Sequence, residues 1–260
     1  CIKAPNYWQT YQKLSPNFRG GINLALVIFM IAQPVCIYLF INSSLFNSMI
    51  SLYKPDIRFT VPKDIRLTNK PNLVFIYLEG FERTFLNETA FPGLAPNLIQ
   101  LESKGLSFNN IKEVYGTRWT IAGMVASQCG LPLQPVANAN KPGTFMPKAT
   151  CLGDVLHDNG YYQAYIGGAS MRFGGKGNFY NTHQFDSIEG RDELIGKLPE
   201  STPLTQWGLY DDKLFDLALN KLDQLKQQDK PYVLFLLSLD THPPKGYPSP
   251  SCDGIQYQQG

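Results

Sequence analysis

The longest hydrophobic stretch of the chain runs from Ile22 to Ile41 and contains no charged residue. A helix needs about 20 residues to cross the ~30 Å hydrocarbon core of a bilayer, so this stretch predicts a transmembrane helix. The alternative is a helix buried in a protein core. Three basic residues precede the stretch, Lys3, Lys13 and Arg19. They favour a cytoplasmic N-terminal flank and place everything after residue 42 outside the cytoplasmic membrane.

From Pro71 onward, short apolar runs alternate with amphipathic segments, which is typical of an α/β domain with a parallel, doubly wound sheet. Two of the runs, at 72–78 and 232–239, are continuously apolar, which predicts strands buried on both faces. We also expect helices at 95–104, 152–159 and 209–228, a helix that begins near Thr117 or Thr120 and stops at Gly130, and short strands at 106–111 and 162–166.

These patterns divide the chain into four parts. They are a flanking segment at 1–21, the transmembrane helix at 22–41, a polar, proline-containing linker at 42–70 and a globular domain at 71–260. The chain begins with cysteine and stops abruptly, so we expect a fragment truncated at both ends.

Charge and cysteine content limit the expected partners, metal sites and disulfides. The 23 basic residues nearly balance 21 acidic ones, so nucleic acid is not an expected partner. The five cysteines include no Cys-x-x-Cys pair, which disfavours a cysteine zinc site. In a domain outside the cytoplasm, a disulfide between Cys129 and Cys151 is one option, and free thiols are the other.

The candidate chemistry begins where the first strand ends. Glu79 follows that strand, at the edge of the sheet where α/β proteins bind ligands. A carboxylate is a hard ligand suited to Mg²⁺ or Mn²⁺, and the alternative is a salt-bridged or capping acid. Thr117 and Thr120 lie at the start of a helix, where a hydroxyl can cap the helix or act as a nucleophile.

These residues together carry a resemblance. Glu79-Gly80 after a strand, followed by Gly116-Thr117-x-x-Thr120 and a helix that ends in Cys-Gly-Leu-Pro132, resembles the lipoteichoic acid synthase and phosphoglycerol transferase group. That group belongs to the alkaline phosphatase and sulfatase superfamily. The resemblance covers roughly residues 70 to 252. It implies an alkaline phosphatase-like sheet, a metal ligand at Glu79 and a metal-bound threonine nucleophile.

The resemblance also favours one of the two threonines. In related sulfatases a glycine ends the nucleophile's helix ten positions later, and counting back from Gly130 gives Thr120. Thr117, one turn earlier, is then expected to cap the helix. The remaining metal ligands of the family, an Asp-His pair, would fall beyond Gly260.

Three further residues are candidates for substrate binding, and the resemblance implies this role for Lys176 and His242. Arg172 and Lys176 lie in a glycine-rich loop, where backbone and cations can approach a phosphate, although an ordinary exposed loop is the alternative. His242 follows the second buried strand, and its alternative is an exposed turn histidine. Asp240 is expected to orient His242 or to cap a turn, while Asp211 serves the dipole of the long helix.

The resemblance therefore implies a membrane-anchored phosphoglycerol transferase that acts outside the inner membrane. It would move glycerophosphate from phosphatidylglycerol, or a related phospholipid, to a glycan or glycerol acceptor through a phosphothreonine intermediate. The expected cofactor is Mn²⁺ or Mg²⁺, with Zn²⁺ as the alternative. Rival interpretations are a phosphoethanolamine transferase, a phosphodiesterase or sulfatase-like hydrolase, and a catalytically silent membrane sensor.

Overall fold

The computed structural model describes residues 15–18, 20–24, 29, 64–114, 116–133 and 143–252. The chain divides into two units, Cys1–Phe59 and Thr60–Gly260. Most of the expected transmembrane helix at 22–41 lies outside the described residues. Within the described ones, no helix combines the length and the apolar character that a bilayer crossing requires.

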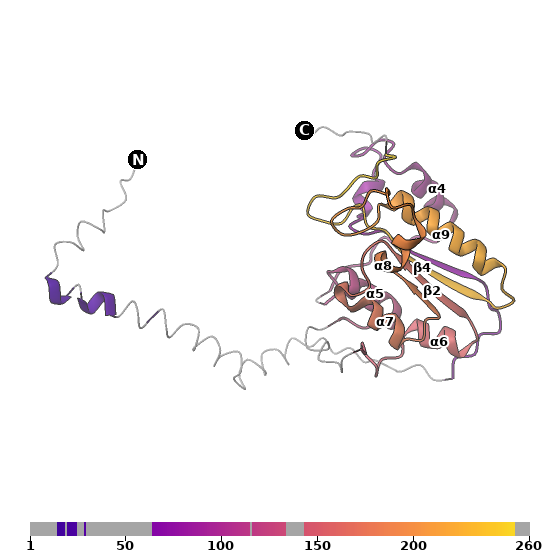
Figure 1. Ribbon diagram of the computed structural model, residues 1–260, viewed down its shortest axis with the longest axis horizontal. Helices are drawn as coiled ribbons and strands as arrows, with labels where there is room; N and C mark the ends of the chain where they lie inside the picture. The colour runs from indigo at the N-terminus through magenta and orange to yellow at the C-terminus, as the bar shows by residue number, and fades with distance from the viewer. Residues whose placement is uncertain are drawn as a thin grey trace. The chain divides into compact units, whose positions relative to one another are not determined.

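The second unit is built on a four-stranded sheet with the order β1-β4-β2-β3 (Figure 1). Every pairing of neighbouring strands is parallel, as the alternation of strands and helices in the sequence predicts. The strands are β1 (Leu73–Tyr77), β2 (Tyr162–Gly167), β3 (Ser187–Glu189) and β4 (Tyr232–Leu237).

Helices connect these strands. Pro96 occupies the first turn of its helix, where its missing N–H costs nothing, and Gly130 ends another helix in the left-handed conformation, at φ 67°. The helices predicted at 95–104, 152–159 and 209–228 all form, within two residues of the expected ends. The helical elements described in this unit are η1 (Arg83–Leu86), α4 (Pro96–Lys104), α5 (Thr120–Cys129), α6 (Leu152–Asp158), η3 (Phe173–Gly175), α7 (Lys176–Thr182), α8 (Arg191–Leu194), η4 (Ile195–Lys197) and α9 (Asp211–Lys226).

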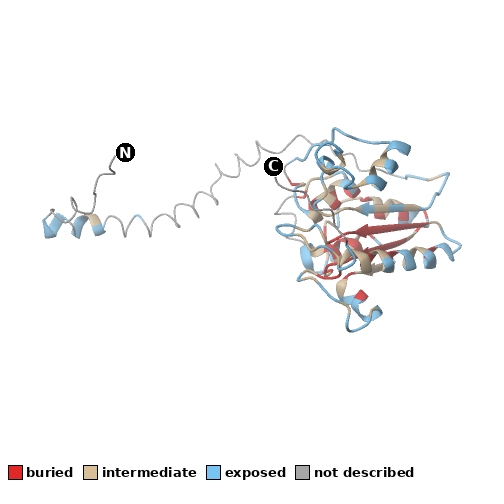
Figure 2. Ribbon diagram, turned by 90° about the horizontal axis from the view of Figure 1, so that it is seen from above, coloured by how far each residue is buried: buried red, intermediate tan, exposed pale blue. Residues whose placement is uncertain are grey.

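Helices cover both faces of the sheet, and β4 shows this best because all six of its residues are buried. Val233, Phe235 and Leu237 pack in one hydrophobic cluster with residues of α5, α6 and α7. Leu234 and Leu236 point the other way, into a second cluster with residues of α8 and α9. The same arrangement is visible in Figure 2, where the central strands are buried between helices. The expectation of a doubly wound sheet with β4 buried on both faces is confirmed.

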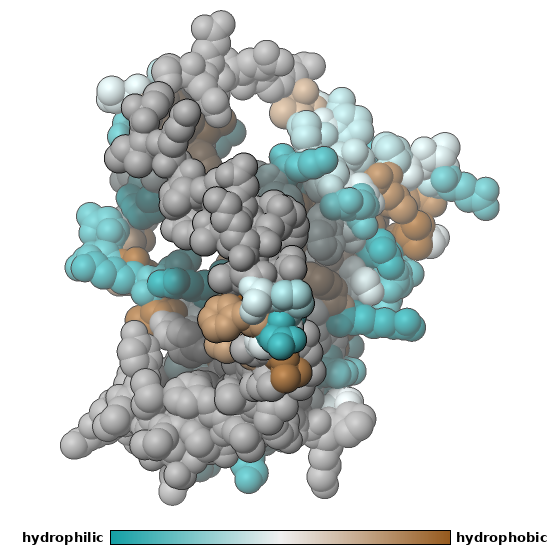
Figure 3. Space-filling view, turned by 90° about the vertical axis from the view of Figure 1, so that its left-hand side faces the viewer, coloured by the Kyte–Doolittle hydropathy of each residue, from teal (hydrophilic) through white to brown (hydrophobic). Residues whose placement is uncertain are grey.

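Two strand predictions are wrong. β1 is partly buried on one face and exposed on the other, where Val74 and Ile76 are 49% and 52% exposed. It lies at the edge of the described sheet. Residues 106–111 form no strand, and Leu106 and Phe108 are exposed. A strand needs a neighbour for its backbone hydrogen bonds, and none of the described residues pairs with this segment. Figure 3 shows hydrophobic residues exposed among hydrophilic ones on the face that it presents.

Candidate functional site

Glu79 and Thr120 meet in the folded domain although 41 positions separate them. The hydroxyl Oγ1 of Thr120 lies 2.9 Å from Oε2 and 3.1 Å from Oε1 of Glu79. The contact forms because Glu79 stands just beyond the carboxyl end of β1 and Thr120 is the first residue of α5. The expected approach of these two side chains is therefore observed, while their roles as ligand and nucleophile stay predictions.

The backbone of Glu79 is fixed from the neighbouring strand. Its N–H donates to Ser238 Oγ at 2.9 Å, and its carbonyl oxygen accepts a hydrogen bond from Thr241 Oγ1. Gly80 follows with φ +62°, and a Cβ on it would lie 2.6 Å from the carbonyl oxygen of Thr241, so only glycine fits. The sequence interpretation missed Ser238 and Thr241, whose only signal was polarity at the end of an apolar run.

An open pocket of about 570 Å³ surrounds the Glu79–Thr120 contact. The pocket draws its residues from the end of β1, the start of α5 and the segment that follows β4. Besides Glu79 and Thr120, its lining is Tyr77, Leu78, Gly80, Phe81, Glu82, Glu113, Thr117, Arg118, Trp119, Gly123, Met124, Leu237, His242 and Pro243.

Thr117 does not cap α5, so that expectation is wrong. Its hydroxyl accepts the N–H of Val114 at 3.1 Å and donates to the carbonyl of Val114 at 2.9 Å, closing a turn before the helix. The N-cap position belongs to Trp119, and no side chain caps the helix. The first amides of α5 are consequently available to an anion in the pocket.

Lys176 is buried, with 3% of its surface exposed, so the ordinary exposed loop is wrong for this residue. Its Nζ donates to the carbonyl of Phe173 at 2.9 Å and lies 4.9 Å from the centre of the Phe173 ring. Burial lowers the pKa of Lys176 to about 8, and the negative charge of Glu79 opposes that shift. The amine is therefore near enough to Glu79 to feel its charge.

Arg172 is placed differently. It is exposed, is absent from the pocket lining, and its charge acts on Asp192. The structure thus separates the two cations of the glycine-rich loop.

His242 lines the pocket as a partly buried side chain. Its Nδ1 lies 2.8 Å from the carbonyl oxygen of Pro243, which can only accept, so Nδ1 carries a hydrogen and Nε2 is left for a ligand. The ring stands 4.6 Å from that of Trp207. Asp240 does not contact the imidazole in any hydrogen bond described. Its carboxylate accepts the N–H of Asp211, at the start of α9, and the hydroxyl of Ser249.

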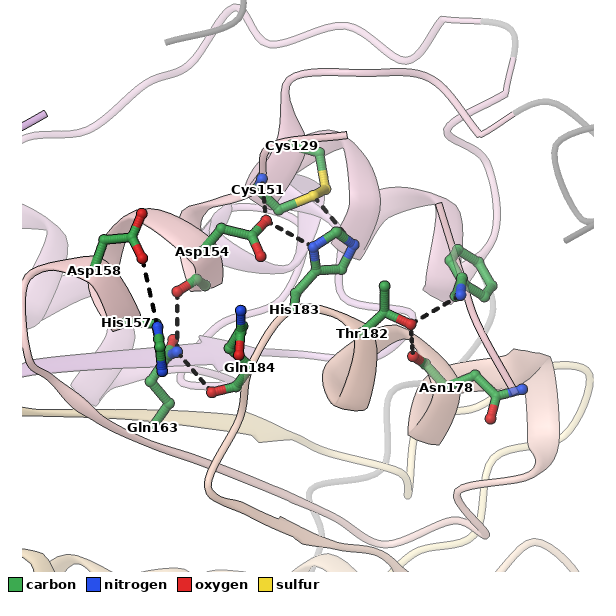
Figure 4. Close-up of polar contacts among 12 residues, drawn as sticks. Cys129, Cys151, Asp154, His157, Asp158, Gln163, Asn178, Thr182, His183 and Gln184 are labelled. Atoms are coloured by element: carbon green, nitrogen blue, oxygen red, sulfur yellow. Dashed lines mark hydrogen bonds and ion pairs between the residues drawn. A yellow bond between two sulfur atoms is a disulfide. The ribbon is translucent and has the colours of Figure 1, made fainter. Parts of the chain in front are cut away.

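The oxygen atoms of Glu79 and Thr120 suit a hard divalent cation, because both converge on one point of an open pocket. A second group of metal-ligand type in the described residues is formed by Cys129, Cys151 and His183, whose ligand atoms lie within 4.8 Å of one another. Here, however, the two sulfurs are bonded to each other, so this group is a disulfide beside a histidine (Figure 4). His183 is buried, with its Nδ1 2.8 Å from Asp154 Oδ2.

The chain is similar in sequence to one family of known proteins. The family model described as Sulfatase matches residues 71–259. Phosphoglycerol transferase I of Escherichia coli is 41% identical over 191 residues, which make up 72% of this chain and 25% of that protein. The enzyme of the same name from Escherichia fergusonii is 40% identical over the same shares. The chain therefore spans about a quarter of the length of these relatives.

Two solved structures share the fold. A protein of the alkaline phosphatase superfamily from Vibrio parahaemolyticus superposes with a TM-score of 0.56 at 24% identity, over 74% of this chain and 45% of that one. The lipoteichoic acid synthase LtaP from Listeria monocytogenes gives a TM-score of 0.54 at 16% identity, over 69% and 43%. Because the family match extends over the whole of the α/β unit from β1 onward, this chain belongs to the sulfatase family.

Proposed function

We propose that this chain is part of a metal-dependent phosphoglycerol transferase that is anchored in the inner membrane and acts outside it. It moves glycerophosphate from phosphatidylglycerol, or a related phospholipid, to a glycan or glycerol acceptor. The observation that carries the proposal is the contact between Thr120 Oγ1 and the Glu79 carboxylate inside the pocket. Support comes from the 41% identity to phosphoglycerol transferase I over 191 residues.

The Thr120 hydroxyl is oriented for attack. It has one hydrogen, which it donates to Glu79, so its lone pairs are left for an electrophile in the pocket. The uncapped start of α5 adds backbone N–H groups beside the same oxygen. Those amides stabilise the negative charge that a phosphoryl group carries and develops during transfer.

The transfer takes two displacements at phosphorus. In the first, Thr120 Oγ1 forms a bond to the phosphorus of the lipid and the bond to the diacylglycerol oxygen breaks. Threonine gives up one proton and the diacylglycerol takes one up, which leaves glycerophosphate esterified to Thr120. In the second, an acceptor hydroxyl attacks the same phosphorus, the bond to Thr120 breaks, and the threonine hydroxyl is restored.

Glu79 and Thr120 would hold the divalent cation, Mn²⁺ or Mg²⁺ with Zn²⁺ as the alternative. When bound, such an ion supplies positive charge to the nucleophilic oxygen and to the phosphoryl oxygens. Lys176 adds its own charge near Glu79, and His242 presents Nε2 to the phosphate or to the glycerol hydroxyls. Arg172 lies outside the pocket lining, and its expected part in substrate binding stays a prediction.

The test uses a protein that carries the whole catalytic domain, incubated with phosphatidylglycerol labelled in its headgroup glycerol. After an acid quench, label should remain covalently attached to Thr120, as mass spectrometry of the peptide would show. Phosphatidylethanolamine labelled in its headgroup serves as the competing donor and should leave no label. Absence of a Thr120 adduct together with normal product formation would overturn the covalent mechanism, and a preference for phosphatidylethanolamine would overturn the donor.

A further inference from the structure

The segment that carries His242 is hydrogen-bonded to the start of α9 through Asp211 and Asp240. The carboxylate of each aspartate accepts the backbone N–H of the other. Asp211 Oδ1 accepts the N–H of Leu239 at 2.6 Å, and Asp211 Oδ2 accepts the N–H of Asp240 at 3.0 Å. In return, Asp240 Oδ1 accepts the N–H of Asp211 at 3.0 Å. Three hydrogen bonds thus join residues that lie 28 or 29 positions apart.

The far end of the segment is also hydrogen-bonded to these residues. Ser249 Oγ donates to Asp240 Oδ2 and accepts the N–H of Asp212 at 3.3 Å. The N–H of Tyr247 donates to the carbonyl of Asp240 at 2.6 Å. Residues 240 to 249 therefore form a loop whose two ends are both held at the first turn of α9.

His242 lies inside this loop. Its N–H donates to the carbonyl of Leu239 at 2.9 Å, and its own carbonyl accepts the N–H of Gly246 at 3.1 Å. Trp207, which precedes α9, lies against the His242 ring, with the ring centres 4.6 Å apart. The backbone of His242 is thus held by Leu239, whose own N–H is one of the two that Asp211 binds.

A carboxylate suits this task because it has two oxygens for two N–H groups. These N–H groups belong to residues just beyond β4, where the parallel ladder no longer supplies them with partners. An asparagine has one carbonyl oxygen and would leave one of the two donors unpaired in a partly buried place. The helix dipole, the role expected of Asp211 from the sequence, does not require such a bidentate contact.

We infer that Asp211 is a positioning residue for the transfer reaction, holding Leu239 and Asp240 so that His242 faces the pocket in which Glu79 and Thr120 meet. This inference rests on the proposed function, in which His242 contacts the substrate. Asp211 itself does not line the pocket. It acts on the substrate only through the histidine.

The first test measures the contact without using activity. Amide hydrogen exchange of a peptide spanning 236–249 is compared in the wild type, in Asp211→Asn and in Asp216→Asn. Asp216 is the matched control, since it lies on the same helix, is exposed and pairs only with Lys213, at 3.6 Å, in the contacts described. Asp211→Asn should raise the exchange rate of this peptide about tenfold, because one donor loses its acceptor. Asp216→Asn should not change it, and unchanged exchange in Asp211→Asn would overturn the inference.

The second test asks whether Asp211 acts through His242. In the transferase assay Asp211→Asn should lower turnover about tenfold in the wild type, yet cause no further loss in a His242→Gln background. If Asp211→Asn lowers turnover by the same factor in both backgrounds, Asp211 supports the fold in general. That result would overturn the positioning role. If the wild type transfers no glycerophosphate, the proposed function fails instead. The exchange result then still decides whether Asp211 holds the loop.

Discussion

At the scale of single residues, the two threonines near the start of α5 have different partners. Thr120 donates to Glu79, whereas the hydrogen bonds of the Thr117 hydroxyl to described residues go to the backbone of Val114. Thr120→Ala should therefore abolish the covalent adduct from labelled phosphatidylglycerol, while Thr117→Ala should keep measurable turnover. The loss of the Thr117 turn should cost about 1 kcal/mol of stability. Turnover in Thr120→Ala but not in Thr117→Ala would place the nucleophile one turn earlier.

The burial of Lys176 predicts how the free energy of unfolding depends on pH. Its pKa is about 8 in the folded protein, below the value of 10.5 that an exposed lysine has. Between these two values the unfolded chain binds more protons than the folded one, so the free energy of unfolding should rise with pH. The gain between pH 8 and pH 10 should be about 2 kcal/mol.

The control for this prediction is Lys176→Met, which fills the same site without a titratable group. Urea unfolding of both proteins at several pH values isolates the contribution of Lys176, because the other groups, buried tyrosines included, are common to both. Parallel stability curves for the two proteins would show that Lys176 is not buried as described.

How far single residues could be predicted depends on where their partners lie. The approach of the Glu79 region to the start of α5 was predictable, because strand ends and helix starts gather at one edge of a parallel sheet. The choice of Thr120 over Thr117 came from the family resemblance. The burial of Lys176 was not predictable, because it depends on a loop folding back so that the amine meets Phe173. The hydrogen bonds of Asp211 with Leu239 and Asp240 could not be predicted either, because they span 28 and 29 positions.

At the scale of elements, α5 is attached at both of its ends. Thr120, the first residue of α5, is hydrogen-bonded to Glu79. Cys129, its last residue, is disulfide-bonded to Cys151, which directly precedes α6. The disulfide closes a loop with a sequence separation of 22. Removing it through Cys129→Ala and Cys151→Ala together should lower the free energy of unfolding by about 3 kcal/mol, because the unfolded chain gains freedom.

Cys252→Ser is the matched control for the disulfide, since that cysteine is exposed and unpaired. Its stability in urea should equal that of the wild type. If the double alanine variant is as stable as this control, the bond contributes nothing to the fold. A fall in adduct formation that exceeds the fall in folded protein would show that the far end of α5 also sets the place of Thr120.

Elements with local signals were predictable, and elements that depend on neighbours were not. Pro96 and Gly130 mark helix ends by their own backbone preferences, and both helices form as expected. The apolar run of β4 matches its central place between β1 and β2. A similar run in β1 lies at the edge of the described sheet, with Val74 and Ile76 exposed. An apolar run shows what a strand can bury, whereas the strand order decides what it does bury.

At the scale of the whole molecule, the pocket depends on the strand order. β1 pairs with β4, so the residues that follow each strand, Glu79 on one side and Ser238 to His242 on the other, come to the same edge. The rule that ligands gather at this edge could be applied to the sequence. The β1-β4-β2-β3 order could not be read from it, because non-consecutive strands become neighbours through crossovers whose geometry no local pattern encodes.

The last prediction concerns the side of the membrane on which the domain lies. If residues 22–41 span the bilayer with a cytoplasmic N-terminal flank, the α/β unit faces the outside. Cys252 reports on this directly, because it is exposed and free whereas Cys129 and Cys151 are bonded to each other. A membrane-impermeant maleimide should therefore label Cys252 in intact cells. The Cys252→Ser variant measures any background from Cys1 and Cys36. Labelling that requires lysis would place the domain in the cytoplasm, away from any acceptor outside the membrane, and would contradict the proposed topology.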